Sequence, residues 1–153
     1  MAHRCAANST SPSGSMMTPD VLVMSPDATV ADALARIREP EILVSIAAQV
    51  FVAHAPHYPP TGTYLGVVHF QRLLREPPST LVSAVIDKDL EPVGPLSPLS
   101  TVARYFATYN LVALPVVDEA GRLLGAVTVD DLVDHMLPED WRQNDGEEVQ
   151  DGA

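Results

Sequence analysis

Thr128 and Asp131 are the residues of this chain whose types and spacing best fit a binding site. They stand where the strand-like run 123–128 gives way to a helical pattern. Phosphates bind to hydroxyls and to free backbone N–H groups at helix starts, and a ribose binds to a carboxylate. Three residues of separation place both side chains on one face of the first helical turn. The same spacing also fits a helix cap, in which Thr128 caps the backbone and Asp131 favours the helix dipole.

Carboxylates nearby suggest a second kind of chemistry. Asp130 and Asp134 are four residues apart and share a helix face. The acids within 87–91 alternate, so they project to one side if that stretch is extended. Magnesium prefers oxygen ligands and keeps several waters, so two carboxylates from different elements can suffice, although a solvated acidic face explains the pattern too. The candidate magnesium ligands are Asp130, Asp134, Asp87, Asp89 and Glu91.

Composition limits the classes of function. The chain has 153 residues and a net charge of −11, with nine basic and 20 acidic residues, which disfavours binding to nucleic acid. Its one cysteine, Cys5, provides no internal disulfide and no cysteine-based metal site. No apolar run approaches the roughly 18 residues that cross a bilayer, so we expect a soluble, cytoplasmic chain without direct membrane insertion. No nucleophile elbow, Walker loop or dinucleotide fingerprint is present, so we expect no enzyme.

An internal duplication shows which elements position these residues. Residues 24–37 align with 93–106 without a gap, and their shared apolar positions recur at helical spacing. Residues 64–74 align with 123–133, with Gly66 opposite Gly125. Each half therefore predicts a turn, a helix, a strand, a hairpin, a second strand and a second helix. The expected strands are 49–54, 63–70, 111–118 and 122–129, and the expected closing helices are 71–76 and 130–137.

This order resembles the cystathionine-β-synthase (CBS) domain family. The stretch "LVALPVVDEAGRLLGAVTVDDLVDHM" carries the resemblance in the second half, and "SPDATVADALARI" with "YLGVVHFQRLL" carries it in the first. The resemblance covers roughly residues 17 to 137. It implies an α+β fold, a tandem CBS pair of two β-α-β-β-α units packed sheet to sheet, and a homodimer. The implied divisions are a flexible leader 1–16, a degenerate unit 17–80, a second unit 81–138 and an acidic tail 139–153.

The acidic stretch "TVDDLVDHMLPEDWR" looks most like the cytosolic regulatory region of the MgtE family of magnesium transporters. The resemblance implies a regulatory module that binds an adenine nucleotide (ATP, ADP or AMP) between its units, or Mg²⁺ through carboxylates. The implied partner is a magnesium-transporter-type N-terminal domain or a membrane channel. The alternative is an interaction module that serves only dimerisation and whose sites bind nothing.

In the family, a threonine binds the phosphate and an aspartate binds the ribose, and these correspond to Thr128 and Asp131 in this sequence. The resemblance also implies that Ala113, Leu114 and Pro115 could line the slot for the base. The first half departs from this pattern, because His69 and Arg72 replace the threonine and the aspartate. Arginine cannot accept from ribose hydroxyls. We therefore expect the first cleft to be a lapsed site or one rebuilt for an anion.

Overall fold

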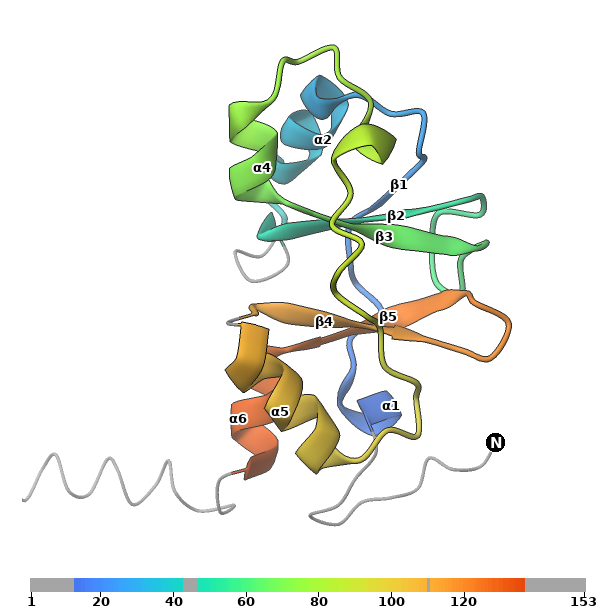
Figure 1. Ribbon diagram of the computed structural model, residues 1–153, viewed down its shortest axis with the longest axis vertical. Helices are drawn as coiled ribbons and strands as arrows, with labels where there is room; N and C mark the ends of the chain where they lie inside the picture. The colour runs from blue at the N-terminus through green and yellow to red at the C-terminus, as the bar shows by residue number, and fades with distance from the viewer. Residues whose placement is uncertain (1–12, 43–46, 110, 137–153) are drawn as a thin grey trace, which may run out of the picture.

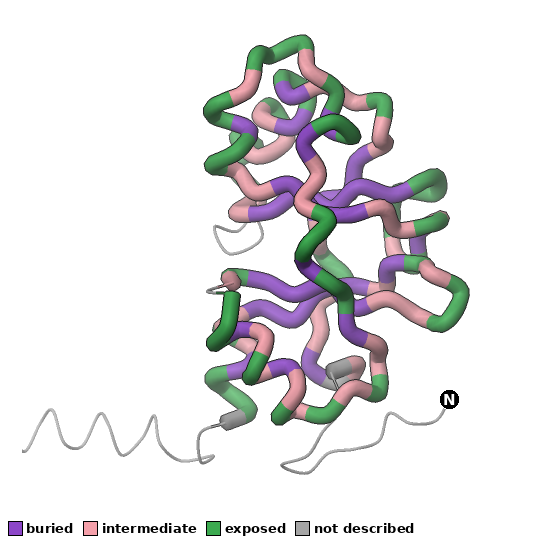
Figure 2. The backbone as a smooth tube through the Cα atoms, in the orientation of Figure 1, coloured by how far each residue is buried: buried purple, intermediate pink, exposed green. Residues whose placement is uncertain are grey.

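The protein is described by a computed structural model in residues 13–42, 47–109 and 111–136. Two sheets stack face to face in the centre, and helices cover their outer faces (Figure 1). Helices α2 and α4 lie over one sheet, and α5 and α6 lie over the other (Figure 1). Burial is concentrated along the strands in this central double layer (Figure 2). The expected α+β fold of two units packed sheet to sheet is confirmed.

The first unit has the expected order of elements. Its strands are β1 (Val23–Met24), β2 (Gln49–Ala53) and β3 (Tyr64–His69), with β1 parallel and β3 antiparallel to β2. Its helices are α2 (Val30–Ile37) and α4 (Phe70–Arg75). A 3₁₀ helix, Val82–Val85, follows, and α1 (Ser13–Met16) precedes them all.

The second unit repeats this plan with a shorter first strand. Val93 makes a single parallel bridge to Val116 in the position that β1 occupies in the first unit. The remaining elements are α5 (Leu99–Tyr109), β4 (Ala113–Val117), β5 (Leu123–Thr128) and α6 (Val129–Met136). None of the helices within the described ranges is both long and apolar enough to cross a membrane. The predicted tail 139–153 and residues 1–12 of the predicted leader lie outside the described ranges.

Strand β2 is buried along its whole length because both of its faces are covered. Val50 and Val52 face α2 and α4 and belong to the core of the first unit. Phe51 and Ala53 alternate with them and pack against the second sheet, in a core shared by both units. Gln49 occupies the same inter-sheet face as Phe51, so the period of two places a polar side chain between the sheets.

Two chain segments cross between the units. Thr18 exchanges backbone hydrogen bonds with Ala126 on β5, with N···O distances of 2.8 and 3.0 Å. Asp87 donates its N–H to the Val67 carbonyl on β3 at 2.7 Å, which is the equivalent contact in the first unit. Met16 accordingly packs in the core shared with the second unit, whereas Val82 packs in the first. The two units therefore exchange packing segments, and the division into 17–80 and 81–138 stays a prediction.

Asp118 holds the turn between β4 and β5, where Gly121 has the positive φ of 84° that the sequence predicts. Its carboxylate accepts from the N–H groups of Ala120 and Arg122 and from the Arg122 guanidinium, whose Nε lies 2.9 Å away. Burial raises the pKa of Asp118, but these bonds outweigh burial and hold the pKa below its usual value.

We expect Asp118→Ala to lower the free energy of unfolding by about 1 kcal/mol at pH 7. A carboxylate with a depressed pKa stabilises the fold above its unfolded pKa of about 3.9 and stops doing so as the pH falls through its lower folded value. The difference between Asp118→Ala and the parent should therefore shrink as the pH falls below about 3.9. Urea unfolding at pH 7 and at a series of lower pH values measures it. Glu119→Ala, an exposed neighbour in the same turn, should change stability by less than about 0.5 kcal/mol, and a pH-independent loss in Asp118→Ala would contradict the assignment.

Candidate functional site

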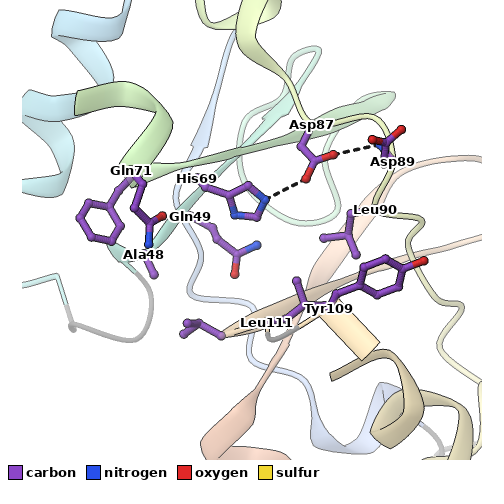
Figure 3. Close-up of a pocket in the computed structure, with 11 residues that line it drawn as sticks. Ala48, Gln49, His69, Gln71, Asp87, Asp89, Leu90, Tyr109 and Leu111 are labelled. Carbon is purple, nitrogen blue, oxygen red and sulfur yellow. Dashed lines mark hydrogen bonds and ion pairs between the residues drawn. The ribbon is translucent and has the colours of Figure 1, made fainter. Parts of the chain in front are cut away.

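A pocket of about 280 Å³ lies between the two units, at the ends of β2 and β3. Its first wall comes from β2, the start of α4 and the segment after the 3₁₀ helix, and its second from the connection between α5 and β4 (Figure 3). Exposed residues, among them Gln71 and Asp89, border it, so a small molecule could enter from solvent. The lining residues are Ala48, Gln49, His69, Phe70, Gln71, Asp87, Asp89, Leu90, Tyr109, Leu111 and Val112.

Gln49 ties the pocket to both units. Its Oε1 accepts the backbone N–H of Ala113, the first residue of β4, at 2.8 Å. Because a carbonyl must face that N–H, the amide nitrogen faces the other way, into the space bounded by His69, Leu90 and Tyr109 (Figure 3). The residue is only 2% exposed, and its Nε2 has no hydrogen-bond partner among the described residues. An unpaired buried donor costs about 1–3 kcal/mol, which an acceptor on a ligand would recover.

His69 and Asp87 form one side of the pocket. The Nε2 atom of His69 lies 3.0 Å from Oδ2 of Asp87, and Oδ1 of Asp87 accepts the Asp89 N–H at 2.9 Å (Figure 3). Burial raises the pKa of Asp87, but the His69 bond and the backbone N–H groups outweigh burial, so the pKa lies below its usual value. Asp87 is therefore ionised at neutral pH and fully engaged, and it holds the His69 ring in place.

The Asp89 carboxylate is the available acceptor of the pocket. Asp89 is exposed, and its side chain has no hydrogen-bond or ion-pair partner within the described ranges. Tyr109, half exposed, presents its ring on the opposite wall beside Leu111 (Figure 3). The pocket thus combines a buried donor, a solvent-facing carboxylate and apolar walls, which is the usual composition of a site for a small polar molecule.

Thr128 and Asp131 form a capping box at the start of α6. The N–H of Asp131 donates to Oγ1 of Thr128 at 3.1 Å, and the Thr128 N–H donates to Oδ2 of Asp131 at 3.3 Å. The Thr128 hydroxyl also donates to Asp131 at 2.9 Å, and Thr128 is only 6% exposed. The same motif caps α2, where Thr29 and Asp32 make the same two backbone bonds. The capping alternative therefore describes the geometry, and a ligand at Thr128 would have to replace these bonds.

Comparison with known proteins identifies this architecture. A family model for the CBS domain matches residues 14–79 and 82–138. The chain belongs to the CBS domain family. Magnesium transporter MgtE of Thermus thermophilus is 31% identical over 121 residues, which cover 79% of this chain and 26% of the transporter. The CBS pair thus spans about a quarter of the length of the curated relatives it matches.

Solved structures agree with this assignment. The cytosolic domain of the Mg²⁺ channel MgtE in complex with ATP superposes on this CBS pair with a TM-score of 0.69 at 30% identity. The superposition covers 81% of this chain and 48% of that one. The soluble part of a magnesium transporter superposes with a TM-score of 0.70 at 24% identity, over 86% of this chain and 48% of that one. The resemblance to the MgtE cytosolic region inferred from the sequence is confirmed.

The residues predicted to hold a base lie inside the CBS pair. Ala113 and Leu114 are 4% and 0% exposed, and Pro115 is buried beside them on β4. Two of the apolar residues that line the pocket, Leu111 and Val112, immediately precede that strand. The described pocket also lies at His69, in the half where the sequence led us to expect a lapsed site or one rebuilt for an anion. Arg72 is not among the residues that line the pocket, and its Nε lies 2.6 Å from Oε2 of Glu76.

The candidate magnesium ligands are divided between two places. Asp87 and Asp89 meet at the pocket, whereas Glu91 is exposed further along the segment. Asp130 and Asp134 lie on α6 in the second unit. Within the described ranges, no group of three or more His, Cys, Asp or Glu side chains is placed to hold a metal ion.

Gln49 was missed from the sequence, although a signal for it exists. The run 49–54 reads as an apolar strand, and glutamine is its one polar residue before His54. The alternation places it on the face of Phe51, which is buried, and a polar group on a buried face needs a hydrogen-bond partner. That the partner would be Ala113, 64 positions away, follows only from how the units dock.

Proposed function

We propose that this CBS pair is a ligand-sensing regulatory module that binds an adenine nucleotide, or its nucleoside part, in the pocket beside His69 and thereby controls a partner domain or transporter. The unpaired amide nitrogen of Gln49 is the observation that carries the proposal. A buried donor that faces a pocket marks a place where a ligand acceptor improves the free energy of the complex.

The pocket can hold the two recognisable parts of a nucleoside. Adenine ring nitrogens are acceptors, and glutamine side chains are well suited to donate to them. The Gln49 amide would donate a hydrogen bond to the base at the buried end, and Leu111 and Tyr109 would pack against the faces of the base. The Asp89 carboxylate at the open end would accept from the ribose hydroxyls. This arrangement gives the first unit the binding role that the sequence assigned to Thr128 and Asp131, and the site at those two residues stays a prediction.

Binding would act on the relative placement of the two units. Gln49 and His69 belong to the first unit, whereas Tyr109 and Leu111 belong to the second. A ligand that contacts both walls favours the arrangement in which the pocket is closed, and its differential affinity sets how far the equilibrium moves. The similarity to MgtE supports a magnesium-transporter partner, and the ATP complex of its cytosolic domain supports an adenine ligand.

A thermal-shift experiment tests the proposal. ATP, ADP, AMP, adenosine, S-adenosylmethionine and Mg²⁺ are each added at millimolar concentration to the intact chain. A ligand present at 100 times its Kd stabilises the folded state by about 2.7 kcal/mol, which raises the melting temperature by several degrees in a domain of this size. We expect at least one adenine compound to do so. A melting temperature that no adenine compound changes would favour the non-binding interaction module.

Magnesium and self-association belong to the same proposal. Asp87 and Asp89 could attract Mg²⁺ with waters completing its shell, and any such binding should be weak. The expected homodimer stays a prediction, which light scattering of the chain would decide. We propose no catalytic role for the pocket, because its pair of His69 and Asp87 faces no nucleophile among the described lining residues.

A further inference from the structure

The charges around the pocket distinguish among adenine compounds. We infer that the pocket selects a nucleoside whose 5′ substituent carries no negative charge, and that it discriminates against phosphates in the order adenosine, AMP, ATP. This inference rests on the proposed function, since it names the class of ligand that the same pocket takes. It concerns binding in the absence of divalent cations.

Acidic side chains stand where phosphates would emerge. The lining includes two carboxylates, Asp87 and Asp89, while none of its described residues is a lysine or an arginine. Asp87 is ionised, because its pKa is held below the usual value despite burial. Two like charges near a protein surface repel appreciably at separations below about 10 Å, the Debye length at 0.1 M salt. A phosphate attached to a bound ribose would lie within this distance of Asp89.

The basic residues closest to the pocket in the sequence, Arg72 and Lys88, do not line it. Arg72, one turn into α4, is paired with Glu76. Lys88 is exposed and is not among the lining residues, as expected for a side chain that alternates with Asp87 and Asp89 in an extended segment. Of the described lining residues, His69 contacts the Asp87 carboxylate, whereas none pairs with the carboxylate of Asp89.

Size acts in the same direction as charge. A volume of about 280 Å³ lies near the lower end of the range for small-molecule pockets, which begins at about 300 Å³. Such a volume suits a nucleoside, so a triphosphate would extend beyond the rim. The exposed groups at that border include the carboxylate of Asp89 and the uncharged amide of Gln71, in a chain whose net charge is −11. Phosphates would thus add repulsion without gaining a contact to a lysine or an arginine of the described lining.

Isothermal titration of the intact chain with adenosine, AMP and ATP, in buffer containing EDTA, tests the inference. We expect AMP to bind about 10-fold more weakly than adenosine and ATP more weakly again. Asp89→Asn keeps an acceptor and removes the charge, so it should lower the ratio of the ATP and adenosine Kd values at least about threefold. Asp27→Asn makes the same charge change at an exposed residue outside the pocket and should leave this ratio unchanged.

The outcomes separate the inference from the proposed function. If ATP binds as tightly as adenosine, or if both aspartate variants change the ratio equally, selection by pocket charge is wrong and the sensing function stands. If neither adenosine nor any phosphate derivative binds, both are wrong. Circular dichroism of each variant ensures that the comparison is between folded proteins.

Discussion

Adenosine binding falls by about 10- to 100-fold when Gln49 is replaced by glutamate and measured at pH 8. The substitution keeps an oxygen that can accept the Ala113 N–H, so the contact between the units survives. It replaces the donor that faces the pocket by a second oxygen, which repels an acceptor on the ligand. Isothermal titration gives the affinity, and thermal melting shows whether the fold is retained.

Three further variants make this result specific to the pocket. Gln49→Leu removes both roles of the side chain and should lose binding together with about 1–3 kcal/mol of stability. Gln71→Ala changes an exposed lining residue and should alter the adenosine affinity by less than about threefold. Thr128→Val should cost about 1 kcal/mol of stability through the lost cap but leave the affinity intact. Loss of binding in Thr128→Val and retention in Gln49→Glu would place the site at α6 instead.

The second large effect is expected at Gly125, where a single methyl group should lower the free energy of unfolding by about 3 kcal/mol. A Cβ at this position would collide with the Thr18 carbonyl oxygen, which is backbone and cannot rotate away. Relief requires the segment that carries Met16 to leave β5, which breaks the paired hydrogen bonds between Thr18 and Ala126. Urea unfolding of Gly125→Ala against the parent measures the loss.

Gly121→Ala is the matched control for this prediction. Gly121 has a positive φ of 84°, but nothing lies within 4 Å of a Cβ placed there. Its cost should be limited to backbone strain, about 1 kcal/mol. A Gly125→Ala loss no larger than the Gly121→Ala loss would show that the crossing segment does not pack on β5 as described.

The duplication made most of the fold predictable. The apolar run in 49–54 and the glycine turn at 121 gave strands and a hairpin within a residue or two of those observed. The crossing of segments between units was not predictable. The sequence shows Gly66 and Gly125 but not which residues pack against them in the folded chain. A Cβ on Gly66 would meet Ile86 and one on Gly125 would meet Thr18, contacts between residues 20 and 107 positions apart.

The site was less predictable than the fold for a physical reason. The T-x-x-D pattern at Thr128 is real, but the sequence cannot tell whether such a pair bonds to a ligand or to itself, and here the two residues bond to each other. His69 lacks that pattern and yet borders the pocket, because its ring is held by Asp87 from a separate segment. Whether a crevice stays open depends on docking between units, which leaves no mark in the sequence of either half.

The side-chain amide of Gln49 offers the most direct measurement of the central claim. In ¹⁵N-labelled protein titrated with adenosine, its two Nε2 proton resonances report on the donor that faces the pocket. We predict that they shift and saturate with the Kd obtained by calorimetry, while the backbone amides of Thr128 and Asp131 move little. Unchanged Gln49 resonances alongside saturating shifts at Thr128 and Asp131 would contradict the assignment of the ligand to this pocket.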